Sequence, residues 1–300
     1  MPNKVVVGSC WAKSSAVLID NPAVSPSHTG YQLIPMRKLI SSFAGALICA
    51  VATLVTAHAA EVDKRCFEMR VYTANPGKMD DLHARFRDHT LKMFARHGIE
   101  SIGYWLPVNN TENKLYFMIA YPSREARETL WQKFQDDPAW KKAKADSEKN
   151  GALVAKAEST FLQATDYSPL VRASKAGGGK EGKVTDRVFE LRTYTASPNN
   201  LANLNARFRD HTVKLFAKHG MTNIGYWVPM ADQPGAQDTL IYFLAHKSQE
   251  AAKESFKAFG GDAEWTAARK ASEEKGGGPL TVKGGVKSIF MAPTDYSPMR

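Results

Sequence analysis

The sequence is poor in cysteine, which excludes two classes of cross-linked protein. Only three cysteines, Cys10, Cys49 and Cys66, occur among 300 residues. The first two fall in a segment that we expect to be removed, so the remaining thiol cannot build a disulfide framework or a cysteine-based metal site. No two histidines lie three or four residues apart. The sequence therefore predicts no preformed metal centre.

The motifs of several large enzyme classes are also missing. Neither a P-loop, nor Gly-x-Ser-x-Gly, nor Gly-x-Gly-x-x-Gly after a strand-like segment occurs. Hydrolase, nucleotidase and dinucleotide-binding functions are left without support, and no cofactor is required by the sequence.

A dense run of basic residues is the third absence. The formal net charge of +10 comes from 40 basic and 30 acidic residues. The longest basic stretch, from Lys141 to Lys149, is interrupted by Asp146 and Glu148. This pattern is typical of a solvated surface, so we expect no nucleic-acid partner.

The N-terminal segment has the plan of a secretory signal. A basic head, Met36-Arg37-Lys38, precedes an apolar stretch from Leu39 to Val55, and Ala57-His58-Ala59 follows. We expect residues 36–59 to be a signal peptide and the chain to be exported, to the periplasm or outside the cell. An uncleaved membrane anchor is the alternative. Residues 1–35 are then a leader or a misassigned start.

The rest of the chain consists of two similar sequence repeats. The heptapeptide Ala84–Thr90 returns unchanged at 206–212, and Thr165–Pro169 returns at 294–298. From Phe67 to Val108, 25 of 42 positions are identical to their counterparts without a gap. This self-similarity implies duplication. We expect a first repeat at 66–169, a glycine-rich linker at 170–187 and a second repeat at 188–298.

Each repeat has the element order β–α–β–β–α–β. Residues 67–73 alternate as in a strand, and 78–97 follow a helical period that stops at Gly98. Apolar runs at 99–108 and 115–121 suit strands. Ser123 and Asp137 precede two pieces of a second helix, and 158–164 is the closing strand. We therefore predict an α+β fold of two ferredoxin-like repeats.

Such a sheet carries helices on one face only, so its other face must be covered. Pairing the two repeats face to face covers it and gives an α+β barrel. The linker is long enough to allow this pairing within one chain, as an intramolecular pseudo-dimer. Whether two chains pair further is left open.

At this point the chain resembles the NIPSNAP family. The residues that carry the resemblance are the strand Phe67–Tyr72, the helix with Phe86-Arg87-Asp88-His89, the turn His97-Gly98 and Gly103-Tyr104-Trp105. The second repeat resembles the family equally. The resemblance implies a dimeric α+β barrel but little chemistry, since no general reaction is established for the family. Relatives by fold include cofactor-free monooxygenases, haem-degrading enzymes and lactone isomerases.

The first strand of each repeat carries polar residues on one face. We expect these six side chains to face the barrel interior and to contact a small-molecule ligand: Glu68, Arg70, Tyr72, Glu190, Arg192 and Tyr194. The alternative is a Glu–Arg–Tyr network that fixes strand register.

Aromatic and histidine residues supply the other candidates. In Tyr104-Trp105 and Tyr226-Trp227 one ring of each pair must face the barrel, so Trp105 and Trp227 join the candidate ligand contacts. His89 and His211 are the candidates for a general base, with a packing role as the alternative. His97 and His219 precede a glycine at a helix end, where interaction with the helix dipole explains them.

Two functions from different classes follow. The first is an exported protein that binds a small, partly aromatic ligand or a protein partner in or on the barrel. The second is a cofactor-light enzyme of the monooxygenase or isomerase type, with His89 or His211 as base and Arg70 or Arg192 as the oxyanion partner.

Overall fold

The computed structural model describes residues 62–171 and 187–300. The expected leader, the expected signal peptide and most of the expected linker lie outside these described residues. Among the helices in the two described ranges, none is long and apolar enough to cross a membrane.

The two repeats have the same order of elements. The first consists of β1 (Cys66–Ala74), α1 (Met79–Arg85), η1 (Phe86–Thr90), α2 (Leu91–Arg96), β2 (Glu100–Pro107), β3 (Lys114–Tyr121), α3 (Arg124–Asp136), α4 (Pro138–Ser147) and β4 (Val154–Ala164). The second consists of β5 (Val188–Ala196), α5 (Leu201–Arg207), η2 (Phe208–Thr212), α6 (Val213–Lys218), β6 (Thr222–Pro229), β7 (Thr239–His246), α7 (Gln249–Gly260), α8 (Ala263–Lys275) and β8 (Thr281–Pro293).

Local sequence signals explain where the second helix of the first repeat begins and restarts. The Ser123 hydroxyl accepts a hydrogen bond of 3.1 Å from the Ala126 amide at the start of α3. The Asp137 carboxylate accepts one of 2.8 Å from the Ala139 amide, and Pro138 is the first residue of α4. Both are N-cap interactions, so the predicted break in this helix is confirmed.

The first helix of each repeat contains a π-helical turn, which the sequence pattern did not predict. The turns η1 and η2 fall in the identical segments Phe86–Thr90 and Phe208–Thr212. In η1 the Thr90 hydroxyl donates to the Arg85 carbonyl over 3.1 Å, which satisfies an acceptor at the turn. The same bond of 3.1 Å recurs between Thr212 and Arg207. One extra residue is thereby accommodated without ending the helix.

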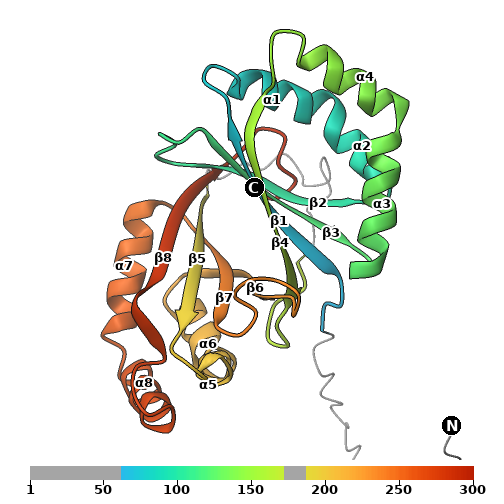
Figure 1. Ribbon diagram of the computed structural model, residues 1–300. Coiled ribbons are helices and arrows are strands. Elements are labelled where there is room, and N and C mark those ends of the chain that lie inside the picture. The colour runs from blue at the N-terminus through green and yellow to red at the C-terminus, as the bar shows by residue number, and fades with distance from the viewer. Residues whose placement is uncertain (1–61, 172–186) are drawn as a thin grey trace, which may run out of the picture. The chain divides into compact units, whose positions relative to one another are not determined.

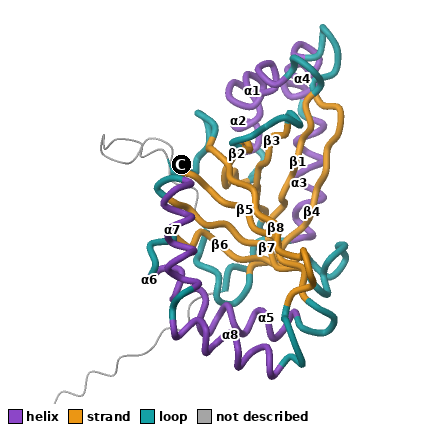
Figure 2. The backbone as a smooth tube through the Cα atoms, turned by 90° about the vertical axis from the view of Figure 1, so that its left-hand side faces the viewer, coloured by secondary structure: helices purple, strands orange, loops and turns teal. Residues whose placement is uncertain are grey.

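The strands form one closed barrel in the order β1-β3-β2-β8-β5-β7-β6-β4. Two sheets of four antiparallel strands meet at two joints, β2 with β8 and β4 with β6. Helices α1 to α4 cover one side of the strands and α5 to α8 the opposite side (Figures 1 and 2). The predicted pairing of two ferredoxin-like repeats into an α+β barrel within one chain is confirmed.

The segment after the last strand of each repeat crosses to the other repeat. In the first repeat the Tyr104 amide donates to Ser297 Oγ over 2.9 Å, and its carbonyl accepts from the Thr294 amide at 3.0 Å. In the second repeat the Tyr226 amide donates to Ser168 Oγ over 2.9 Å. The two Thr-Asp-Tyr-Ser-Pro segments are therefore reciprocal arms.

The direction of the β1 and β5 side chains differs from the expectation. We expected six side chains inside the barrel: Glu68, Arg70, Tyr72, Glu190, Arg192 and Tyr194. This orientation is wrong, because Phe67, Met69, Phe189 and Leu191 fill the barrel interior. The polar residues point to the opposite faces, which the helices cover. Apolar side chains from two facing sheets exclude water from the interior, whereas the helix side supplies polar partners for buried charges.

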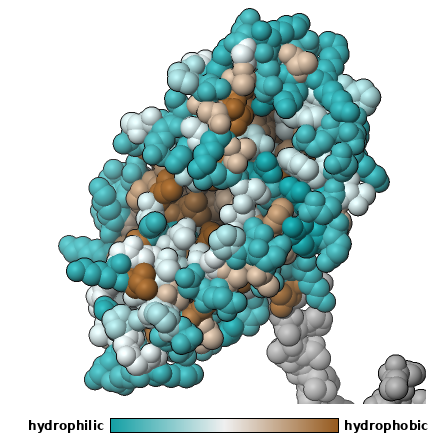
Figure 3. Space-filling view, viewed as in Figure 1, coloured by the Kyte–Doolittle hydropathy of each residue, from teal (hydrophilic) through white to brown (hydrophobic). Residues whose placement is uncertain are grey.

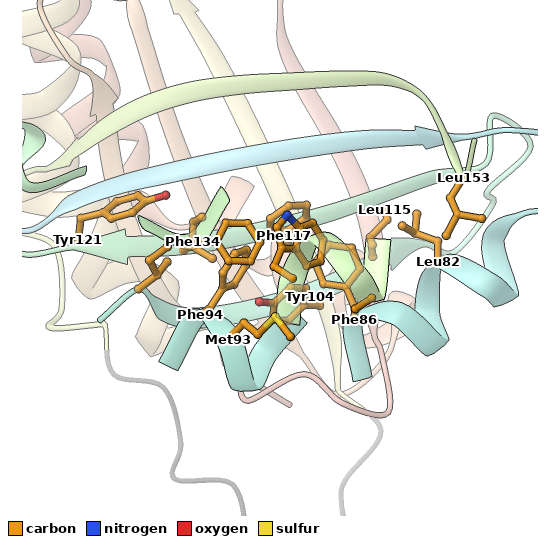
Figure 4. Packing of buried hydrophobic residues seen from close by; sticks show 14 of the residues in the cluster. Leu82, Phe86, Met93, Phe94, Tyr104, Leu115, Phe117, Tyr121, Phe134 and Leu153 are labelled. Carbon is orange, nitrogen blue, oxygen red and sulfur yellow. The ribbon is translucent and has the colours of Figure 1, made fainter. Parts of the chain in front are cut away.

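Three apolar clusters hold the fold together. One lies inside the barrel, and the other two lie between each sheet and its helices. Trp105 and Trp227 lie in the barrel cluster, whereas Tyr104 and Tyr226 lie on the helix sides, as the alternation predicted. Figure 4 shows the helix-side cluster of the first repeat, in which Phe117 lies between the strands and the helix that carries Phe86.

Candidate functional site

A pocket of about 630 Å³ lies between the sheet and the helices of the first repeat. Its wall is formed by Arg70, Tyr72, Arg85, Phe86, Thr90, Phe94, Trp131, Gln132, Phe134, Gln135, Trp140, Lys144, Glu148, Ala152, Val154 and Ala157. Aromatic rings thus surround two arginines that belong to different elements, β1 and α1.

Arg70 is the arginine of the sheet side of this pocket. Its guanidinium lies over the Trp131 ring, 4.5 Å from the ring centroid, and donates to the Tyr72 hydroxyl over 3.3 Å. One of its terminal nitrogens also donates to Glu68. Its Nε is buried and has no hydrogen-bond partner. An unmatched donor at the wall of a pocket is one that a ligand's acceptor can satisfy.

Glu68 is fully buried, and four side-chain hydrogen bonds compensate its charge together with the Arg70 contact. Arg127 of α3 donates twice, over 3.3 Å each, Tyr121 over 2.8 Å and Ser159 over 2.6 Å. Burial acts to raise the pKa of Glu68, but the Arg70 charge and the donors of Arg127 and Ser159 outweigh it and lower this pKa. The carboxylate therefore stays ionised beside two guanidiniums, of which Arg127 also pairs with the exposed Glu128 at 3.2 Å.

The second repeat has an equivalent network with a different balance. Glu190 accepts from Ser288 over 2.5 Å, lies 2.9 Å from His246 Nε2 and pairs with Arg192. Burial acts to raise the pKa of Glu190, but the His246 contact and the Arg192 charge lower it overall. One guanidinium thus meets one carboxylate. Ala252, four residues after the cap Ser248, stands where Arg127 follows Ser123.

Arg70 and Arg192 differ in the aromatic residue that lies opposite each of them on the neighbouring strand. In the register of each sheet Phe117 lies opposite Arg70, and Tyr242 lies opposite Arg192. Arg192 Nε donates to the Tyr242 hydroxyl over 2.9 Å. Phe117 has no hydroxyl, which leaves Arg70 Nε without a partner. Arg192 is therefore satisfied by the protein, and Arg70 is not.

Arg85 is the second arginine of the pocket, and the sequence analysis missed it. Its position four residues after Asp81 is typical of an exposed helical ion pair, but the structure buries Arg85. Arg85 is only 5% exposed and donates to Glu148 over 2.7 Å, with its Nε lacking a partner. The available signal was its position three residues after Leu82 and next to Phe86, both on the apolar face of the helix.

The histidine candidates lie elsewhere. His89 is exposed and His211 half-buried, and His89 does not line the pocket. His97 and His219 instead contact the cap aspartates of α4 and α8, at 2.8 Å from Asp137 and 2.7 Å from Asp262. The His97 hydrogen bond is the main cause that lowers the pKa of Asp137 to about 2.

The tryptophan candidates are separated from the arginines by the sheet. Trp105 and Trp227 lie inside the barrel, where Trp105 packs 5.7 Å from Phe189 and Trp227 5.5 Å from Phe67, measured between ring centroids. The structure therefore does not bring them together with Arg70 or Arg192. Among residues 62–171 and 187–300, no group of three or more His, Cys, Asp or Glu is placed to hold a metal ion.

The surface view shows where other apolar residues are exposed. Hydrophilic residues cover most of the face in Figure 3, and apolar ones gather in a hollow near its centre.

Comparison with known proteins identifies both repeats with one family model. The model described as NIPSNAP matches residues 67–169 and again 189–298, together more than half of the chain. No curated protein is similar enough in sequence to be matched.

Solved structures match either about a third of the chain or about three quarters of it. A NIPSNAP-like domain protein of Burkholderia xenovorans is 17% identical, covers 36% of this chain and 91% of its own, and has a TM-score of 0.33. A NIPSNAP family protein of Agrobacterium tumefaciens is 20% identical, with coverage of 36% and 94% and a TM-score of 0.32. A proposed monooxygenase of Fusobacterium nucleatum is 9% identical, with coverage of 77% and 92% and a TM-score of 0.51. This last likeness shows a shared fold alone.

Proposed function

This chain belongs to the NIPSNAP family, and we propose that its first repeat binds a small anionic molecule with an aromatic or otherwise flat body. The observation that carries the proposal is Arg70, whose buried Nε has no partner at the wall of a pocket lined by aromatic rings. Binding of a carboxylate or a similar acid group there would complete the hydrogen bonds of this guanidinium.

The charges around the pocket support an anion rather than a neutral ligand. Arg70 and Arg85 are basic residues of the pocket wall, and Arg70 shares its carboxylate partner Glu68 with Arg127. Lys144 adds a further positive charge to the wall, and Glu148 is the acidic residue among the lining side chains. Trp131, over which Arg70 already lies, offers a flat surface for an aromatic ring.

The experiment compares two small probes on the full chain. Isothermal titration calorimetry with 2-naphthoate and the uncharged 2-naphthamide tests whether the acid group is recognised. We expect naphthoate to bind at least tenfold more tightly than the amide, since a charge-assisted hydrogen bond is at stake. Equal affinity for the two probes would contradict an anion site.

A matched pair of variants locates the site. Arg70→Gln should weaken naphthoate binding about tenfold or more, while Arg192→Gln in the second repeat should leave it unchanged. Glu68 keeps Arg127, Tyr121 and Ser159 as partners in the Arg70 variant. Equal losses in both variants would place the site elsewhere.

We do not extend the proposal to the enzyme alternative. Its candidate bases are His89, which is exposed, and His211, which belongs to the second repeat; neither lines the pocket wall, so neither would meet a substrate held by Arg70. A base must lie within hydrogen-bond reach of the proton that it removes.

Export remains part of the proposed role. It rests on the basic head, the apolar stretch and the small residues of segment 36–59. N-terminal sequencing of the protein recovered from its own host should find a chain that begins near Glu61. An intact segment 36–59 on a protein confined to the cell interior would contradict export.

A further inference from the structure

Glu148 forms an ion pair with Arg85, one of the two arginines that line the pocket. It follows the last residue of α4, and its carboxylate accepts from Arg85 over 2.7 Å. Arg85 is 5% exposed, whereas the Glu148 side chain is 24% exposed. The arginine is therefore held in the wall, and the carboxylate has solvent on one side into which it can turn.

The second repeat shows the same three positions in another arrangement. Glu273 lies 3.8 Å from Arg207, the counterpart of Arg85, and 3.0 Å from Arg269 on the next turn of α8. Arg269 and Glu273 lie seven and eleven residues after the cap Asp262, as Lys144 and Glu148 do after Asp137.

Lys144 therefore stands where Arg269 holds the carboxylate in the second repeat. It lies four residues before Glu148 on α4, which is the spacing of a helical ion pair, and it also lines the pocket. The chain thus contains both arrangements, one with the glutamate on the buried arginine and one with the glutamate on the outer cation.

We propose that Glu148 is a displaceable competitor of acidic ligands: it neutralises Arg85 in the empty pocket and moves to Lys144 when the acid group of a ligand that also reaches Arg70 takes its place. This inference rests on the proposed function. Arg85 Nε has no partner, so an incoming carboxylate gains a guanidinium with a donor to spare. A neutral ligand offers no charge to replace that of Glu148 and leaves the pair closed.

The test removes the charge of Glu148 and keeps its shape. Glu148→Gln in the full chain should bind 2-naphthoate about five- to tenfold more tightly than the unchanged protein, because the ligand no longer displaces a charged competitor. Binding of 2-naphthamide should not change. Glu273→Gln is the matched control in the second repeat and should leave both affinities as they are.

A second variant tests whether Lys144 acts by receiving the displaced Glu148 or by contacting the ligand directly. Lys144→Ala should weaken naphthoate binding about threefold when Glu148 is present and clearly less in the Glu148→Gln background, where only the charge of Lys144 at the pocket wall is lost. An equal loss in both backgrounds would mean that Lys144 contacts the ligand itself, and would overturn the proposed movement of Glu148.

The outcomes distinguish this inference from the function on which it rests. Failure of naphthoate to bind either the unchanged protein or Glu148→Gln would reject the anion pocket as a whole. Equal naphthoate affinity in the two proteins would contradict the displacement of Glu148 but would remain consistent with the anion pocket. The thermal midpoint of each variant shows that the fold is retained.

Discussion

In the first repeat a buried glutamate lies between two guanidiniums, whereas in the second repeat the equivalent glutamate meets one guanidinium and a histidine. The strands, helices and reciprocal arms are otherwise alike. Three positions make the difference: Phe117 against Tyr242, Arg127 against Ala252 and Tyr121 against His246. The second repeat satisfies Arg192 internally, whereas Arg70 of the first repeat keeps an Nε without a partner. Under the proposed function, duplication has separated a supporting copy from a binding copy through a few buried residues.

The largest expected difference between the repeats is in stability. Glu68→Gln leaves the charges of Arg70 and Arg127 without a buried counter-ion and should lower the free energy of unfolding by about 3–5 kcal/mol. Glu190→Gln should cost less, about 2–3 kcal/mol, because Arg192 keeps its bonds to Tyr242 and Tyr194. Urea unfolding of both variants measures the difference. Equal losses would mean that the two networks are balanced alike.

The next effect concerns binding and follows from one hydroxyl. Phe117→Tyr should give Arg70 Nε the partner that Tyr242 gives Arg192, and should weaken 2-naphthoate binding about five- to tenfold. The reverse change, Tyr242→Phe, should leave naphthoate affinity unaltered. Titration calorimetry on the two variants, both checked for an unchanged fold by circular dichroism, decides the matter. Undiminished binding by Phe117→Tyr would show that this donor is not used.

A smaller effect is expected in acid. Burial acts to raise the pKa of Glu68 and Glu190, but their cationic and hydrogen-bonding partners lower both below the ordinary value of 4.5. Each carboxylate therefore stabilises the fold above that value, and this contribution is lost as the pH falls below it through the folded-state pKa. When the pH falls from 5 through the folded-state pKa values, the free energy of unfolding of the double variant Glu68→Gln/Glu190→Gln should decrease less than that of the unchanged protein. A parallel loss in both proteins, measured by urea unfolding, would assign the acid sensitivity to other groups.

The smallest effect should be the same in the two repeats. Tyr296 Oη lies 2.8 Å from His83 Nδ1, and Tyr167 Oη donates to Asn205 Oδ1 over 2.6 Å. Tyr296→Phe and Tyr167→Phe each remove one such bond between an arm and the other repeat, and each should cost about 1 kcal/mol. Thermal unfolding compares the two. Clearly unequal costs would show that the arms are not equivalent.

The sequence predicted the duplication, the order of elements and the pairing of the repeats, because these depend on periodicity and on self-similarity. The π-helical turns were beyond it. They depend on where the helix carrying Leu82 and Phe86 must contact the sheet, and a period of apolar residues tolerates one added residue without a visible break.

The principal error at the site was the predicted direction of the polar side chains of β1. Alternation of Phe67 and Met69 with Glu68 and Arg70 shows that the two faces of the strand differ, but both faces are buried here. Nothing in the strand itself tells which face the partner sheet covers. Arg70 was a candidate from the sequence, but the other partners of the carboxylate that it binds, Glu68, come from three other elements: they are Arg127, Tyr121 and Ser159.

The sequence by itself determined that two related ferredoxin-like halves form one α+β barrel, because residue spacing sets secondary structure and a repeat implies a partner surface. Only the tertiary structure decided where charge is left uncompensated. That depends on which donors from distant elements reach each buried carboxylate and guanidinium, and burial makes each missing or added donor count. Arg70 and Arg192 have nearly the same local sequence, and they differ because Phe117 lies opposite the first and Tyr242 opposite the second on the neighbouring strand.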